Sequence, residues 1–408
     1  MPRSTDEPLA RLLAGIEREL DLAVELRHAL HRNPELAHAE RRTAASVAAE
    51  LPVACEAVAE TGLIARVQID RGATQAGDGD AGAFRAGAVA VRAELDGLPI
   101  DERTDVPFAS SNGAMHACGH DVHTAALVAL VRAAHELRED LPAPLLAVFQ
   151  PSEEAYPSGA EQLADGELAA LAPAAVVAAH VHPELPWGSV ALDPGAVNAS
   201  CDAVQITIDG EPTHGAYPHR GRDPVLALAH VVVALHAQVG RRIDPLSPAS
   251  LTVGVLEGGS AENVIPARAR ARGALRAHRQ EDRQALRELV DQVVAGTAAA
   301  HGCRGSVQLV PGEPPLVNDA DIVAGARELL AGAGFQVARE WRSCGSDDFA
   351  FFGALAPVAM AFVGLDGAEG FRTRPLHHPE LLVPDAAVRA VARTQAVLYL
   401  AAARCAAR

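Results

Sequence analysis

The segment Met115-His116-Ala117-Cys118-Gly119-His120-Asp121-Val122-His123 carries three histidines, a cysteine and an aspartate within nine residues. Apolar residues then recur with a helical period over residues 121–139, so the segment is expected to lie at a helix N-terminus. Free N–H groups and the helix dipole at that position favour the thiolate form of Cys118. Thiolate and neutral imidazole are the usual ligands of zinc and of neighbouring divalent metals. The segment therefore predicts a metal site.

Strands and helices alternate on both sides of this segment. Helices are expected at 8–31 and 41–51, and strands at 62–69, 88–95, 145–149, 175–179 and 358–363. A Gly/Asp/Ala-rich loop is expected at 71–87. Glu153-Glu154, His180 and His377-His378 each come after one of these strands. Because ligand sites in α/β sheets lie at the carboxyl ends of the strands, the pattern predicts an α/β catalytic domain with a mostly parallel sheet and one shared site.

The pattern changes near residue 195. Strands are expected at 204–208, 251–256, 267–277 and 306–310, with helices at 223–239 and 281–300. This order, β-α-β-β-α-β, is that of a ferredoxin-like α+β sandwich. After about residue 318 the chain returns to α/β character. We therefore expect a catalytic domain built from 1–194 and 313–408, with the ferredoxin-like domain, 195–312, inserted between them.

Composition excludes several classes of function. The chain has 408 residues, of which 49% are hydrophobic, and its net charge is −17, which argues against nucleic acid or an anionic membrane as a partner. All of its cationic side chains are arginines, so Schiff-base and phosphate-loop lysines are excluded. We find no signal-peptide pattern at the N-terminus and no apolar run of about 18 residues. The six scattered cysteines favour a reducing cytoplasm.

Nine motifs together resemble the cocatalytic metallopeptidase family that includes aminoacylases, hippurate hydrolases and plant auxin-conjugate amidohydrolases. They stand in the family's order and span nearly the whole chain. The motifs are HRNPEL at 31–36, RAELDGLP at 92–99, MHACGHDVH at 115–123, QPSEE at 150–154, His180, THGAYPH at 213–219, NVIP at 263–266, SDDF at 346–349 and LHHP at 376–379.

The resemblance implies both a fold and a set of roles. It implies a metallopeptidase-type catalytic domain with an inserted lid that also forms a homodimer, and two divalent metal ions, Zn or Mn foremost, with Co or Ni as further options. Glu153 is implied as the general base and His214, in the lid, as a contact to the substrate carbonyl, often from the neighbouring subunit. The implied metal ligands are Cys118, His120, Glu154, His180 and His377.

The chain departs from the family at two places. The family usually has Asp where Glu94 stands, and usually has several glycines after the glutamate pair, where this chain has Ala155-Tyr156-Pro157-Ser158. Glu94 therefore has a longer side chain than the residue that usually supports the site in this family. The altered loop after Glu154 bears on the choice of substrate.

Further residues are assigned from the chemistry that an amide hydrolase needs. Hydrolysis needs a nucleophile, an electrophile for the carbonyl oxygen and a proton donor for the leaving amine, and a metal pair with a carboxylate base provides them. Asp96 is expected to support a ligand histidine, although a turn aspartate would also suit the sequence. Asn263 and Arg276 are candidates for binding a substrate carboxylate, with a purely structural role as the alternative. His123, His182 and His378 are expected to be supporting or surface residues.

The leading interpretation is a metal-dependent amidohydrolase that cleaves N-acyl amino acids. A dipeptidase or carboxypeptidase with the same two-metal machinery is the nearest alternative. A thiol hydrolase with Cys118 as the nucleophile would survive removal of metal. A catalytically inactive metal-binding protein is disfavoured because Glu153 and all five candidate ligands are present.

Overall fold

The computed structural model describes residues 7–69 and 87–407, and the chain divides into two compact units. Unit 1 comprises residues 1–195, 317–341 and 351–408, and unit 2 comprises 196–316 and 342–350. The predicted division placed all of 313–408 in the first domain, whereas the structure places 313–316 and 342–350 in unit 2. Ser343 exchanges backbone hydrogen bonds with Val197 and Ala199, which ties the second of these segments to unit 2. The predicted loop at 71–87 lies almost wholly outside the described residues.

Unit 1 is built on an eight-stranded sheet with the order β1-β2-β4-β3-β5-β16-β6-β15. Its central strands β4, β3, β5 and β16 are mutually parallel, as predicted, and β1, β2 and β6 pair antiparallel to a neighbour. The strands are β1 (Cys55–Val58), β2 (Gly62–Val67), β3 (Val89–Glu94), β4 (Leu145–Gln150), β5 (Ala175–Pro186), β6 (Ser189–Ala191), β15 (Gln336–Val337) and β16 (Val358–Asp366).

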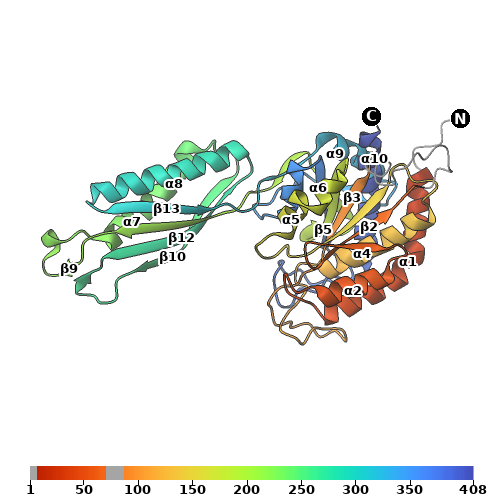
Figure 1. Ribbon diagram of the computed structural model, residues 1–408, viewed down its shortest axis with the longest axis horizontal. Coiled ribbons are helices and arrows are strands. Elements are labelled where there is room, and N and C mark those ends of the chain that lie inside the picture. Colours follow the sequence, from red (N-terminus) through yellow and green to blue (C-terminus); the bar gives the residue numbers. More distant parts are fainter. Residues whose placement is uncertain (1–6, 70–86, 408) are drawn as a thin grey trace. The chain divides into compact units, whose positions relative to one another are not determined.

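Helices cover this sheet, and α1, α4 and α10 pack against one another (Figure 1). Together with one face of the sheet they enclose the main hydrophobic core. The predicted helix at 121–139 is α4, which begins one residue earlier and ends three residues sooner. The helices of unit 1 are α1 (Glu7–Arg32), α2 (Arg41–Glu50), α4 (His120–Glu136), α5 (Gly159–Asp165), α6 (Glu167–Leu171), α9 (Ala320–Leu330) and α10 (Ala386–Ala406).

Unit 2 is the predicted ferredoxin-like sandwich. Its four-stranded sheet has the order β10-β12-β8-β13, in which the first and third strands of the motif lie in the middle, and every pairing is antiparallel. Two helices pack on one face of this sheet and enclose its core (Figure 1). The elements are β8 (Asp202–Asp209), α7 (Pro224–Arg242), β10 (Ala249–Gly258), β12 (Arg268–Ala277), α8 (Gln280–Ala300) and β13 (Arg304–Val310).

Shorter elements complete the described chain. Two two-stranded sheets pair β9 with β11 and β7 with β14. The second pair marks two of the four points at which the chain passes between the units. These elements are β7 (Gly195–Asn198), β9 (Thr213–His214), β11 (Val264–Ile265), β14 (Leu316–Asn318) and the 3-10 turns Pro218–Arg220 and Asp348–Ala354.

Helix α7 is apolar on both faces. Among the described residues it is the one helix that is long and apolar enough to cross a bilayer by length and composition. Five of its residues, including Leu228 and Val231, lie buried against the sheet of unit 2. Leu226 and Val233 remain exposed on its outer side. We therefore regard α7 as a sheet-packing helix with an apolar outer face, and such a face commonly marks an interaction surface.

Candidate metal centre

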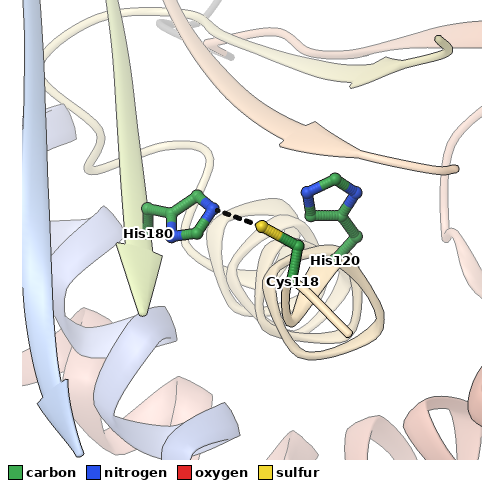
Figure 2. Close-up of side chains that lie close together, drawn as sticks. All are labelled: Cys118, His120 and His180. Carbon is green, nitrogen blue, oxygen red and sulfur yellow. Dashed lines mark hydrogen bonds between the residues drawn. The ribbon is translucent and has the colours of Figure 1, made fainter. Parts of the chain in front are cut away.

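Cys118 and His120 stand at the beginning of α4, where Gly119 turns the chain into the helix (Figure 2). Gly119 has φ +86°, and a Cβ at this position would lie 2.6 Å from the Val181 side chain. Only glycine tolerates that conformation at such a close approach. Both ligand candidates are buried, with Cys118 at 7% and His120 at 1% exposure. The tight turn therefore brings both side chains up to strand β5.

His180 lies on β5 and faces Cys118 (Figure 2). Its Nδ1 lies 2.7 Å from the carbonyl oxygen of Val181 and donates to it, while its Nε2 lies 3.6 Å from the Cys118 sulfur. Burial and the nearby His123 hold the pKa of His180 well below its usual value, so the ring is neutral. A neutral imidazole that donates through one nitrogen presents the lone pair of the other, as metal-ligating histidines do.

Asp96, just past the end of β3, connects His120 to the acidic turn. The backbone carbonyl of Asp96 accepts from His120 Nδ1 at 2.8 Å, and its carboxylate accepts from the N–H of Glu154, also at 2.8 Å. Burial opposes ionisation of Asp96, but the hydrogen bond and charge of His120 outweigh it and hold the pKa of the carboxyl below its usual value. These bonds leave Nε2 of His120 buried and without a hydrogen-bond partner among the described residues.

The turn after β4 presents Glu153 and Glu154, and it is held by residues that sequence reasoning did not single out. Ser152 has φ +52°, a left-handed conformation that costs a non-glycine residue about 1–2 kcal/mol. Its N–H donates to the buried carboxylate of Glu40, which also accepts from the Thr61 hydroxyl. The only sequence signal for Glu40 was its place four residues after Leu36, the last residue of the first motif.

His377 comes from the long loop after β16. Its backbone N–H donates to the carbonyl of Ala117, next to Cys118, at 2.8 Å. Its Nε2 lies 3.1 Å from a carboxylate oxygen of Glu154, and the side chain is 49% exposed. The loop thus brings the fifth candidate ligand to the same place from the far end of the sequence.

The structure brings all five candidate ligands together, in two overlapping sets of donor atoms. The first set is Cys118, His120 and His180, and the second is Cys118, Glu154 and His377. In each set the donor atoms lie within 4.8 Å of one another, and the two sets share Cys118. Glu153 forms a third group with His120 and Glu154, and one of its carboxylate oxygens lies 3.8 Å from His120 Nε2. The donors fit two ions side by side with Glu153 beside them.

A second buried network supports the beginning of α4 from α1. Asp121 accepts from Arg27 at 2.8 Å and from His31 at 2.9 Å, and the other ring nitrogen of His31 lies 3.1 Å from Glu102. Burial lowers the pKa of His31, but Asp121 and Glu102 outweigh it and raise the pKa to about 9. His31 was quoted in the sequence only as part of a motif, and its contacts identify it as a partner of Asp121.

The candidates in unit 2 are arranged differently. His214 and Asn263 share one short ladder, in which His214 pairs with Val264 and the Asn263 carbonyl accepts from Gly215. Both side chains are exposed. The N–H of Ala216 donates to Nδ1 of His214, so the proton of a neutral ring is on Nε2 and faces outward.

Arg276 lies at the other end of this unit's sheet. It donates to the carbonyl of Cys344 at 2.8 Å. Arg276 lies eight residues along β12 from Arg268, the end of the strand that follows the His214 ladder, and eight residues at about 3.3 Å each span about 26 Å. Asn263 and Arg276 of the same subunit therefore cannot both bind one substrate carboxylate.

This fold and this cluster of donors define a class of metal-binding α/β hydrolases with an inserted lid, and comparison with known proteins gives the family. Residues 90–399 match the family described as Peptidase family M20/M25/M40. The chain is 36% identical over 309 residues to an N-acetyl-L-cysteine deacetylase of Bacillus subtilis (strain 168), covering 76% of this chain and 73% of the relative.

Two further comparisons agree with this. An N-acetyldiaminopimelate deacetylase of Shouchella clausii is 34% identical over 77% of this chain and 82% of its own length. A solved dinuclear metal-binding peptidase of family M20 from Bacillus subtilis superposes with a TM-score of 0.79 at 27% identity, covering 94% of this chain and 98% of that one. The chain belongs to peptidase family M20/M25/M40, and it is a hydrolase that acts on amide bonds.

Proposed function

We propose that the protein is a metal-dependent amidohydrolase that removes the acyl group from N-acyl amino acids. The observation that carries this proposal is the pair of donor sets that share Cys118, with Glu153 next to His120. Cys118, His120, Glu154, His180 and His377 are the proposed ligands, and Asp96 supports them through His120 and Glu154. This is the arrangement that an amide hydrolase with a bound metal pair requires.

The donors fit two divalent ions. His120 Nε2 is a buried nitrogen with no hydrogen-bond partner in the described chain, and a metal would satisfy it. One thiolate, three imidazoles and a carboxylate suit Zn or Mn best, with Co or Ni as further options. When bound, such a pair polarises the substrate carbonyl and lowers the pKa of water.

Glu153 is the proposed general base. Its side chain is 12% exposed and lies beside His120 rather than inside either set of ligands. We assign the metal to Glu154 and the proton transfer to Glu153, which can take a proton from water and pass it to the leaving amine. In this proposal Glu154 is a metal ligand and the adjacent Glu153 transfers protons.

The names of the relatives support an N-acyl amino acid as the substrate. The two deacetylases cited above act, by their names, on N-acetylcysteine and N-acetyldiaminopimelate. A dipeptidase or carboxypeptidase has the same needs at the metals, but these two relatives are named for deacetylation. We therefore propose small N-acyl amino acids as the substrates of this chain.

The lid is proposed to act in a homodimer. The exposed apolar side of α7, which includes Leu226 and Val233, is the proposed dimer surface. His214 presents an outward Nε2–H, which suits a donor to a substrate carbonyl in the partner's site. Arg276, or Asn263 from the partner, is proposed to bind the substrate carboxylate. We also propose a cytoplasmic protein, because none of the six cysteines forms a disulfide. The net charge of −17 argues against nucleic-acid or anionic-membrane partners.

One experiment tests the reaction and the metal together. The purified protein, stripped with a chelator and reloaded separately with Zn²⁺, Mn²⁺, Co²⁺ or Ni²⁺, is offered N-acetyl-L-cysteine, N-acetyldiaminopimelate, hippurate and matched dipeptides with a free α-amine. We expect release of free amino acid from the acylated substrates only after reloading. Full activity without metal would support the thiol-hydrolase alternative, and turnover of dipeptides alone would support the peptidase alternative.

A further inference from the structure

A continuous chain of buried hydrogen bonds runs beneath the candidate metal centre. It begins at Gln150, the last residue of β4, whose side-chain oxygen accepts from Arg92 at 2.8 Å. Arg92 is ion-paired to Glu94, and the other oxygen of Glu94 accepts from His123 Nδ1 at 2.9 Å. Gln150, Arg92 and His123 are 0% exposed and Glu94 is 2% exposed. Such a network is stabilising only when its members are paired.

Hydrogen bonds of this network hold the His123 ring in one tautomer. The backbone N–H of Val181 donates to His123 Nε2 at 3.0 Å, so that nitrogen carries no proton. The ring proton is therefore on Nδ1, where Glu94 accepts it. Burial opposes the charge on Glu94, but Arg92 outweighs it and holds the pKa of this carboxyl well below its usual value. With both nitrogens used, His123 has no lone pair to offer a metal.

The other end of this hydrogen-bond network is His180, a candidate metal ligand. Val181 gives its N–H to His123 and its carbonyl to His180 Nδ1, and His180 Nε2 then faces Cys118. The orientation of His180 thus depends on the carbonyl of Val181, and His123 accepts from the N–H of that same residue. Of the two sets of donors proposed to hold the metal pair, His180 belongs to the one that contains Cys118 and His120.

We infer that Glu94 and His123 are positioning residues that set the affinity of one of the two metal ions, the one held by Cys118, His120 and His180, without touching it. This inference rests on the proposed function. A charged Glu94 keeps His123 in the tautomer that accepts from the Val181 N–H. The backbone of Val181 is thereby fixed, and its carbonyl holds His180 in the orientation of a ligand. Outer hydrogen bonds of this kind are typically worth about 10- to 100-fold in metal affinity.

The same atoms allow a competing interpretation, which the experiment must exclude. Glu94, His123 and His180 also have donor atoms within 4.8 Å of one another, and they could form a metal site of their own if His123 lost the hydrogen bond from Val181. In that case Glu94 and His123 would be ligands, and their loss would remove one ion altogether rather than weaken its binding.

The test is Co²⁺ binding to the apo-protein, followed by absorption spectroscopy and a competing chelator. Wild type should bind two ions and show a thiolate-to-cobalt band from Cys118. Glu94→Gln should still bind two ions, with one of them about 10- to 100-fold weaker and with an altered ligand-field spectrum, because an amide can donate to His123 and reverse its tautomer. Glu94→Asp keeps the charge and should recover most of the affinity. Unchanged binding and spectrum in Glu94→Gln would overturn the inference, and so would a stoichiometry of one ion.

Two controls separate this result from simple loss of stability and from failure of the proposed function. Asp202→Asn disrupts a comparable buried carboxylate–arginine pair, Asp202 with Arg283, in unit 2, and should leave both cobalt affinities unchanged. If wild type binds no cobalt, the proposed function fails. If wild type binds two ions and Glu94→Gln is unchanged, only the inference fails.

Replacing His123 gives the same answer if Glu94→Gln does not fold. His123→Asn retains a donor near the Nδ1 position, and His123→Gln retains an acceptor near the Nε2 position. The inference expects His123→Gln to bind cobalt more tightly than His123→Asn, because it keeps the bond from Val181. Equal affinities would contradict it.

Discussion

The two units hold their candidate functional groups in contrasting ways. In unit 1, His120, His180 and Asp96 are buried, and each is fixed by hydrogen bonds to backbone or carboxylate. In unit 2, His214 is exposed, and the hydrogen bond that orients its ring comes from Ala216, two residues away. The contrast suggests that the metal centre is organised before substrate arrives, whereas the lid residues become effective only when another surface meets them.

The strongest test of this comparison is a substitution in unit 1 that removes the proposed general base and leaves the metal ligands in place. Glu153→Gln keeps the shape of the side chain but removes the base. We expect kcat to fall by about 10²–10⁴-fold, because that is the usual contribution of general acid–base catalysis. Metal content, measured by elemental analysis, should stay at the wild-type level.

The matched control is Glu161→Gln, on the exposed first turn of α5. It should keep wild-type turnover. Near-normal kcat in Glu153→Gln would remove Glu153 from the role of base. Loss of metal in that variant would instead make it a ligand, and the division of roles between the two glutamates would have to be revised.

The corresponding change in unit 2 is His214→Ala. Losing one donor to a developing oxyanion costs roughly 10²–10³-fold in kcat. Because the side chain is exposed, we expect no loss of thermal stability and no loss of metal. His219→Ala, an exposed histidine close by, is the control and should remain active.

Mixing experiments decide whether His214 acts across a dimer. Subunits carrying Glu153→Gln and subunits carrying His214→Ala should regain part of the activity after exchange, since each heterodimer contains one complete site. Verified heterodimers without activity would refute the cross-subunit role. A fully active His214→Ala protein would refute any catalytic role for this residue.

The next effect is on stability and concerns the His31 network that supports the beginning of α4. The pKa of His31 is raised from 6.5 to about 9, because Asp121 and Glu102 outweigh the effect of burial. A raised pKa gives stability that is fully present below pH 6.5 and is lost as pH rises through about 9. The stability at stake is on the order of 3 kcal/mol. Urea unfolding of the chelated protein from pH 6 to 9.5 should show this decline.

His31→Gln should lower stability at pH 6 and flatten the decline toward pH 9. His236→Gln, which replaces an exposed histidine of α7, should leave the profile of wild type unchanged. If wild type and His31→Gln lose stability in parallel over this range, the charged His31–Asp121 pair is not what ties α1 to α4.

Much of the fold was predictable because each of its long elements repeats a simple pattern. The helices of unit 2 and the order of its strands follow from periodicity, as do α1, α4 and the strand that ends before Glu153. The strand predicted at 175–179 is only the first part of β5, which continues through His180 to Pro186. Helix α10, most of whose residues are buried, was not predicted from the sequence. Segment 342–350 was misplaced because its attachment to unit 2 is made by backbone hydrogen bonds, which leave no mark on side-chain pattern.

The site was predictable as a set of residues but not as a network. The ligand candidates have unusual chemistry and stand in clusters, so sequence alone could find them. Glu40, Arg92 and Gln150 were not found as partners, because an isolated polar residue in or beside a strand looks the same whether it is solvated or buried. The role of Glu94 depended on knowing that His123 lies beside it, and only the register of β3 with its neighbours and α4 shows that.

The smallest of the expected effects tests how far the organisation of unit 1 depends on Asp96. This residue contacts His120, from the first set of donors, and Glu154, from the second. Asp96→Asn keeps an oxygen for the Glu154 N–H but loses the charge that favours a fixed His120. We expect both metal ions to bind about 10- to 100-fold more weakly, the usual cost of losing a supporting carboxylate. Asp101→Asn, an exposed neighbour in sequence, should have no effect. The hydrogen bonds of Glu94 lead through His123 and Val181 to His180. Weakening of both ions by Asp96→Asn and of one ion by Glu94→Gln would therefore show that two separate supports hold this centre. If Asp96→Asn weakens a single ion, Asp96 does not link the two sets, and the turn that carries Glu154 must be held by Glu40 and Ser152 alone.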